Sequence, residues 1–163
     1  MAIPQITDYP MPAARAFPAN RTQWRPDAKR AVLLIHDMQR YFLRFYDAKG
    51  QLLPQLIGNL VRLRDWARAN GVPVVYTAQP HEQPAGDRAL LNDMWGPGLT
   101  VAAPDLQEVV AELAPGPDDI VLTKWRYSAF KRSDLLERMR ALGRDQLVIG
   151  GVYAHIGCMV TAV

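Results

Sequence analysis

Four short apolar runs recur along the chain, and each of them leads into polar residues. The runs cover residues 31–35, 72–77, 120–123 and 146–150. Runs of this length are typical of strands that are covered on both faces. Stretches with apolar residues at helical spacing lie between them, and the alternation of strands and helices predicts a parallel α/β sheet flanked by helices.

Three helices are expected between these strands. The first repeats apolar residues at helical spacing over 53–67. The second is expected to begin at Pro104 and to reach Leu113, with its apolar residues on one face. The third covers 135–142, with Ser133 as its N-cap.

Two segments fall outside this pattern. Residues 1–28 contain five prolines, so they predict an extended arm. The arm also carries large apolar side chains, and we expect it to lie on the surface of the domain formed by residues 29–163 or on a partner subunit. Residues 81–100 form a long, irregular segment rich in glycine and proline, which is typical of a functional lid.

The polar residues that follow the strands are Asp37, Gln79, Lys124 and Tyr153. In open parallel sheets, ligands bind beyond the carboxyl ends of the strands. The four residues are therefore expected to meet at one edge of the sheet. Apolar aromatic residues follow Lys124, so this lysine would lose water and need a counter-charge, for which Asp37 is the natural candidate.

Simpler structural roles compete with this interpretation. Asp37 could be the N-cap of a short helix, and Lys124 could simply extend into solvent. Trp95 could be lid packing or one wall of a pocket. Arg88 could be a surface arginine or a clamp for a carboxylate, and His155 a structural histidine.

Composition narrows the class of protein. The net charge of +3 comes from scattered arginines, which disfavours nucleic acid but gives a mild field that favours a small anionic substrate. No apolar run approaches the roughly 20 residues that span a bilayer. The single cysteine, Cys158, and the absence of a signal-peptide pattern predict a cytoplasmic protein. No zinc-site spacing or nucleotide-binding fingerprint is present, so neither a metal nor a cofactor is expected.

Five sequence blocks resemble the isochorismatase family. They cover residues 34–42, 76–80, 87–98, 124–130 and 151–158. The resemblance implies a three-layer α/β/α fold with a mostly parallel, Rossmann-like central sheet. The chain stops at Val163 inside an apparent helix, so C-terminal elements of that fold are expected to be missing.

The resemblance also implies an activity, the hydrolysis of the enol-pyruvyl ether of isochorismate to pyruvate and 2,3-dihydro-2,3-dihydroxybenzoate in siderophore biosynthesis. Asp37 would be the general acid that protonates the vinyl carbon, with Lys124 and Tyr153 as further catalytic residues. The substrate-binding residues would be Phe42, Gln79, Arg88, Trp95, Tyr127 and Gly157. The implied assembly is a homodimer or larger oligomer, with carrier proteins or nonribosomal peptide synthetases as candidate partners.

Three alternatives remain open at this point. The substrate could be 2-amino-2-deoxyisochorismate, from phenazine biosynthesis. The chain could be a cysteine amidohydrolase similar to nicotinamidases, although their nucleophile falls where this chain has Gly157, one residue before Cys158. If Gly157 holds the place of that nucleophile, Cys158 is turned by about 100° around the helix, toward the interior, and Gly157 leaves room for the substrate ring. A non-enzymatic docking platform is the third alternative.

Overall fold

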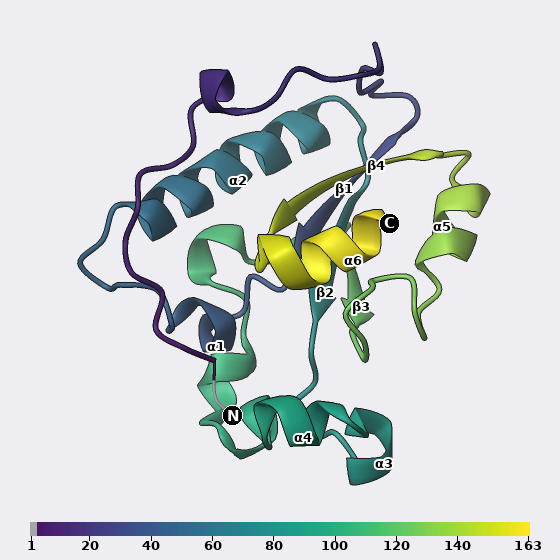
Figure 1. Ribbon diagram of the computed structural model, residues 1–163. Helices are drawn as coiled ribbons and strands as arrows, with labels where there is room; N and C mark the ends of the chain where they lie inside the picture. Colours follow the sequence, from purple (N-terminus) through teal and green to yellow (C-terminus); the bar gives the residue numbers. More distant parts are fainter. Residues whose placement is uncertain (1–2) are drawn as a thin grey trace.

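A four-stranded parallel sheet forms the centre of the computed structural model, which describes residues 3–163 (Figure 1). The strands are β1 (Ala31–His36), β2 (Val74–Ala78), β3 (Ile120–Thr123) and β4 (Gln146–Gly151). Their order in the sheet is β3-β2-β1-β4. Every residue of β1 is buried, because this strand lies between β2 and β4. The predicted parallel sheet is confirmed.

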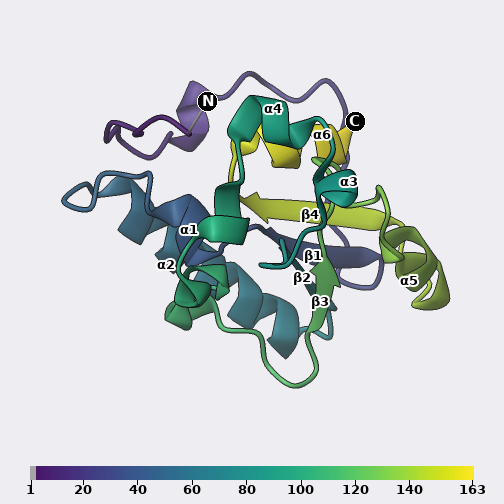
Figure 2. The same cartoon turned by 90° about the horizontal axis from the view of Figure 1, so that it is seen from below.

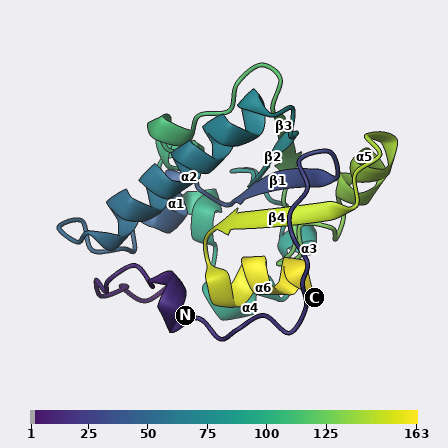
Figure 3. The ribbon, with the colours of Figure 1, turned by 90° about the horizontal axis from the view of Figure 1, so that it is seen from above.

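Helices cover the sheet on both faces, and the three-layer α/β/α prediction is confirmed. Alternate residues of a strand point to opposite faces. Leu33 and Ile35 of β1 pack with α2 (Leu52–Ala69) in the larger core cluster, while Leu34 packs with α5 (Leu135–Ala141) in the smaller one. Figure 3 shows α2 and the C-terminal helix α6 (Met159–Ala162) on opposite sides of the sheet.

The remaining helical elements are short, and most of them lie near the carboxyl ends of the strands. In Figure 1, α1, α3 and α4 lie below the sheet, and Figure 2 views the molecule from below. These elements are α1 (Arg40–Leu43), α3 (Ala85–Arg88), α4 (Leu91–Trp95), the 3-10 turns η1 (Ala14–Ala16), η2 (Gly98–Val101), η3 (Pro104–Gln107) and η4 (Ala111–Leu113), and the π-turn η5 (Ala154–Cys158). The predicted lid segment thus contains two short helices rather than being wholly irregular.

The prediction of a helix from Pro104 to Leu113 is wrong. The segment forms two separate 3-10 turns, and between them Val109 makes an antiparallel bridge with Gln39. The N–H of Val110 donates to the carbonyl of Met38 at 3.0 Å. These backbone groups therefore bond to the segment after β1. They are not available for the hydrogen bonds that a helix would have to form within itself.

The N-cap of α5 is also displaced by one residue from its predicted place. The structure has Asp134 at the cap position. The hydroxyl of Ser133 still accepts a hydrogen bond from the N–H of Leu135 at 3.3 Å, and it donates to the carbonyl of Ala129. Ser133 thus ties the start of the helix to the preceding loop.

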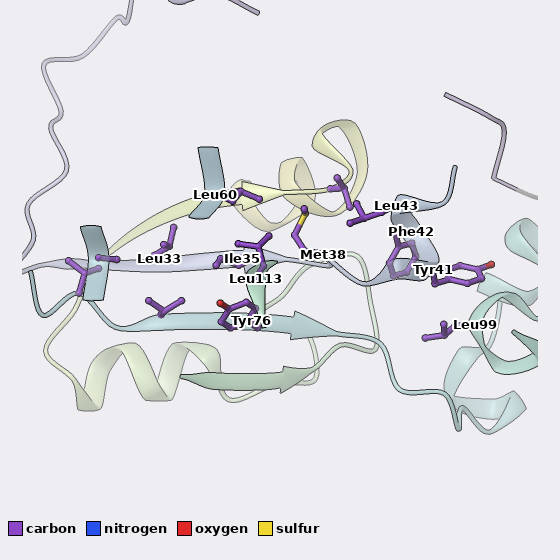
Figure 4. Packing of buried hydrophobic residues seen from close by; sticks show 14 of the residues in the cluster. Leu33, Ile35, Met38, Tyr41, Phe42, Leu43, Leu60, Tyr76, Leu99 and Leu113 are labelled. Atoms are coloured by element: carbon purple, nitrogen blue, oxygen red, sulfur yellow. The ribbon is translucent and has the colours of Figure 1, made fainter. Parts of the chain in front are cut away.

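The larger core cluster extends from the sheet toward its carboxyl edge. Figure 4 shows Leu33, Ile35 and Met38 in sequence along β1 and its extension, followed by Phe42 and Tyr41 beyond the strand end. The edge of the sheet is thereby joined to α1 by continuous apolar packing. Within residues 3–163, no helix is both long enough and apolar enough to cross a membrane.

Candidate active site

A cavity of about 350 Å³ opens beyond the carboxyl ends of the strands. Its volume falls in the range of sites for small molecules. The structure brings all nine sequence-predicted site residues to the lining of this one cavity: Asp37, Phe42, Gln79, Arg88, Trp95, Lys124, Tyr127, Tyr153 and Gly157. Residues more than a hundred positions apart in the sequence therefore share one surface.

Asp37 and Lys124 form a buried ion pair at the centre of this edge. The Asp37 Oδ2 atom lies 2.9 Å from the Lys124 Nζ atom, and the two side chains are only 7% and 3% exposed. Asp37 has a φ of 50°, a left-handed conformation that non-glycine residues rarely adopt. The alternative role as a helix cap does not apply, because the N-cap of α1 is Gln39.

Thr77 holds the Asp37 carboxylate from the other side and was missed by the sequence analysis. Its hydroxyl donates to the Asp37 Oδ1 atom at 2.7 Å and accepts from the Asp37 N–H at 3.1 Å. Thr77 is buried and lies opposite His36 in the parallel register of β1 and β2. A polar residue at the end of an otherwise apolar strand was the available signal.

Gln39 is a second residue without a role in the sequence analysis. It is fully buried, and its amide donates to the carbonyls of Gln79 and Gln107 at 2.9 and 2.7 Å. Its side-chain oxygen accepts from the Gln79 N–H at 2.8 Å. These bonds hold the Gln79 backbone where β2 ends, so the position of Gln79 at the cavity depends on Gln39.

Arg88 gives the cavity an uncompensated positive charge. Its guanidinium is buried and donates to the Gly96 carbonyl at 2.8 and 3.1 Å and to the Gln83 side-chain oxygen at 3.2 Å. No carboxylate of residues 3–163 lies within ion-pairing distance of it. Burial lowers the pKa of Arg88, yet a guanidinium stays charged at physiological pH. Since Asp37 and Lys124 neutralise each other, Arg88 makes the site attractive to an anion.

Aromatic side chains form the cavity walls. The rings of Phe42 and Tyr153 meet edge to face with centroids 6.1 Å apart, and the Trp95 indole N–H donates to the Tyr127 hydroxyl at 2.7 Å. The Tyr153 hydroxyl donates to the Phe42 carbonyl at 2.6 Å. Burial also raises the pKa of Tyr153. The phenol therefore keeps its proton and offers only its oxygen lone pairs to a ligand.

The space beside Gly157 differs from what the sequence predicted. A Cβ atom on Gly157 would lie 2.2 Å from the His36 Cε1 atom, so the freed volume is filled by the imidazole and not left for a substrate ring. His36 is fully buried, with its Nδ1 atom 2.8 Å from the Val152 carbonyl, which requires the proton on Nδ1. Within residues 3–163 its Nε2 atom has no hydrogen-bond partner, and burial lowers the pKa of the ring. A neutral imidazole therefore packs directly against Gly157.

The described residues 3–163 contain no cluster of three or more histidine, cysteine, aspartate or glutamate side chains placed to hold a metal ion. The groups that line the cavity are instead a carboxylate, three cations (Arg88, Lys124 and Arg126), an amide and several aromatic rings. This arrangement can bind an anion with a carbon ring and can transfer a proton from a fixed carboxyl group.

Comparison with known proteins gives one family. The model of the isochorismatase domain matches residues 31–163. The chain is 56% identical to the isochorismatase of Bacillus subtilis, 56% to the phenazine biosynthesis protein PhzD1 of Pseudomonas aeruginosa and 53% to enterobactin synthase component B of Escherichia coli. Each match covers 99% of this chain, but 52%, 76% and 56% of the respective relative. The chain thus spans about half the length of two of these proteins.

Solved structures share the fold. A cysteine hydrolase of Pseudomonas syringae superposes with a TM-score of 0.74 at 26% identity, over 85% of this chain and 67% of that one. The similarity raises the question whether Cys158 is a nucleophile. Cys158 is half-buried and is not among the residues that line the cavity. Burial raises the pKa of its thiol to about 11, which opposes formation of the reactive thiolate.

The packing of Gly157 against His36 predicts that Gly157→Ala destabilises the fold. The added methyl group would displace the imidazole, and overpacking of this kind costs about 1–3 kcal/mol in the free energy of unfolding. Chemical denaturation measures the loss. Gly58→Ala is a matched control, because no atom beyond its own helix backbone and chain neighbours lies within 4 Å of the added methyl group and the helix should gain up to about 1 kcal/mol. Adding His36→Val to Gly157→Ala should cost less than the sum of the two single changes, and simple additivity would contradict the steric explanation.

The position of Cys158 predicts a slow and dispensable thiol. At pH 8 a thiol of pKa about 11 is only about one part in a thousand ionised, so iodoacetamide should label native Cys158 at least ~100-fold more slowly than the unfolded chain. The labelling rate should rise about tenfold per pH unit between pH 8 and pH 10 while the fold persists. Mass spectrometry of timed samples gives the rate. Cys158→Ala should lower the free energy of unfolding by at most about 1–2 kcal/mol. Fast labelling of the native protein at pH 8 would restore the nucleophile interpretation.

Proposed function

This chain belongs to the isochorismatase family, and we propose that it hydrolyses the vinyl ether of isochorismate to pyruvate and 2,3-dihydro-2,3-dihydroxybenzoate. The observation that carries the proposal is the Asp37 carboxyl group, buried and fixed by Lys124 and Thr77 at the wall of a cavity that holds the uncompensated cation Arg88. The site therefore combines a positioned proton donor with a place for an anion.

The chemistry follows from the substrate. A vinyl ether is cleaved most readily after its terminal carbon takes up a proton, which leaves an oxocarbenium ion. The Asp37 carboxylate would take up a proton when the substrate carboxylates bind and share the Lys124 ammonium, and it would then pass that proton to the vinyl carbon as a general acid. Water then adds to the cationic carbon and loses a proton to the Asp37 carboxylate. The resulting hemiketal breaks its bond to the ring oxygen, releasing pyruvate and the ring alcohol, and no covalent enzyme intermediate is needed.

Charged side chains would hold the substrate during this step. The Gly96 and Gln83 oxygens accept from three of the five N–H groups of Arg88. The other two N–H groups can bind one substrate carboxylate. Lys124 would keep the Asp37 carboxyl group in place through their ion pair and approach the second carboxylate. Phe42 and Trp95 would enclose the ring and keep bulk water away from the oxocarbenium ion.

The relatives point to two candidate substrates and to two biosynthetic pathways. Relatives at equal identity are named isochorismatase and phenazine biosynthesis protein, so 2-amino-2-deoxyisochorismate is a second candidate substrate. A third relative is named enterobactin synthase component B, which supports a siderophore role. Carrier proteins or nonribosomal peptide synthetases are the partners we propose for that role. We propose that the chain acts in the cytoplasm as a homodimer or larger oligomer.

The proposed activity predicts that the wild-type chain releases pyruvate from isochorismate. Lactate dehydrogenase reduces this pyruvate, so the oxidation of NADH measures its release. Parallel assays with 2-amino-2-deoxyisochorismate decide between the two candidate substrates by the ratio of kcat/KM. Nicotinamide serves as the comparison for amidase chemistry. Ammonia from nicotinamide without pyruvate from either ether would overturn the proposal.

The role of Asp37 predicts that Asp37→Asn lowers kcat at least ~100-fold with little change in KM, since the amide cannot donate the proton. Thr77→Val keeps the shape of the side chain but removes both hydrogen bonds to Asp37, so we expect a smaller decrease in kcat of about tenfold. Circular dichroism melts establish that both variants fold. A near-normal kcat for the Asn variant would remove Asp37 from the mechanism.

A further inference from the structure

We propose that the start of the N-terminal arm, residues 3–8, is a wall of the binding cavity that sets affinity for the carbon ring of the substrate. The identity of the substrate in this inference rests on the proposed function, whereas the position of the wall does not. Ile3, Pro4 and Ile6 line the same cavity as Asp37 and Arg88. The arm was expected to lie on the surface of the domain or on a partner subunit, so its presence at the site is new.

The first residues of the arm are packed differently from the rest of it. Ile3 and Ile6 are partly buried, whereas residues 7–27 are exposed apart from the partly buried Met11. Ile3 also packs against the larger core cluster. In Figure 1 the start of the purple arm lies beside α1 before the chain passes the beginning of α2. The apolar side chains are therefore held at the cavity, and the remainder of the arm only connects them to β1.

Two backbone-directed anchors hold this segment. The Ile6 N–H donates to the Phe45 carbonyl at 2.7 Å, next to a parallel bridge between Ile6 and Tyr46. The Asp8 carboxylate accepts from the N–H groups of Gln51 and Leu52 at 3.1 and 3.0 Å.

The Asp8 anchor has a clear physical basis. The first N–H groups of a helix have no partner within it, and the N-terminal end of the helix dipole favours an anion. Gln51, the N-cap of α2, makes no side-chain cap of its own, so the carboxylate of a residue 43 positions away takes that role. A side chain on Gly50 would meet Asp8 at 2.3 Å, so glycine at this position admits the carboxylate.

The arm contributes only apolar side chains to the cavity lining, while the strand ends and α3 contribute the charges and the amide. An apolar wall contacts the ring equally in the ground state and in the transition state. Uniform binding of this kind lowers KM and leaves kcat unchanged. Its loss should therefore appear as a rise in KM alone, which distinguishes the arm from the groups that take part in the reaction.

Two variants test the wall in complementary ways. Asp8→Ala removes the anchor and keeps the apolar side chains, while Ile3→Ala/Ile6→Ala removes the side chains and keeps both anchors. Each should raise KM for isochorismate about fivefold with kcat within about twofold of wild type, as expected for losing some 40 Å² of apolar contact. Asp47→Ala is the matched control, because its carboxylate accepts from the Lys49 N–H within its own loop and makes neither of the two anchors. Its KM should equal that of wild type.

A binding probe separates failure of the wall from failure of the proposed function. Anilinonaphthalene sulfonate is an aromatic anion whose fluorescence reports binding without turnover. If wild type releases no pyruvate, the proposed function fails. The wall is still supported in that case if Asp8→Ala and Ile3→Ala/Ile6→Ala each bind this probe about fivefold more weakly than the Asp47→Ala control. Unchanged KM and unchanged probe affinity in the double isoleucine variant, which retains the cap of α2, would overturn the proposal. A fall in kcat with unchanged KM would also overturn it.

Discussion

The buried ion pair between Asp37 and Lys124 is the constraint on which the site depends. Taking two charges out of water costs several kcal/mol for each, and only short contacts and full hydrogen bonding offset this cost. The two residues do not follow neighbouring strands, since β2 lies between β1 and β3. The pair therefore forms only if the end of β2 lets the lysine reach across it.

The end of β2 meets this requirement in two ways. Thr77 places a hydroxyl against the Asp37 carboxylate from the middle strand. The next residue, Ala78, accepts the N–H of Lys124 at 2.9 Å, which extends the pairing of β2 and β3 by one residue past Thr123. The register of three strands thus converges on one carboxyl group, and a slip in any of them would leave a charge buried without a partner.

The sheet and the place of the site could be predicted from the sequence because both follow from local patterns. Short apolar runs define the strands, and parallel topology brings the residues after them, such as Asp37 and Lys124, to one edge. The residues that the prediction missed act through tertiary contacts without a local pattern. Gln39 holds the end of β2 by binding the Gln79 backbone, and Asp8 caps a helix that begins 44 residues later. The false helix after Pro104 has the same origin, since its apolar spacing was helical but the Val110 N–H and the Glu108 carbonyl bond to the segment after β1.

Gly157 and His36 show how a shared fold can restrict chemistry by volume. Position 157 lines the cavity, so a side chain there would be the natural place for a nucleophile near Asp37 and Lys124. In this chain the imidazole of His36 fills that space from within β1, and its Nδ1 proton is bound by the Val152 carbonyl. A side chain at 157 and an imidazole at 36 therefore exclude each other. The Asp37–Lys124 pair is compatible with either arrangement, so the volume of these two positions, more than the charges, decides whether the site can hold a covalent nucleophile.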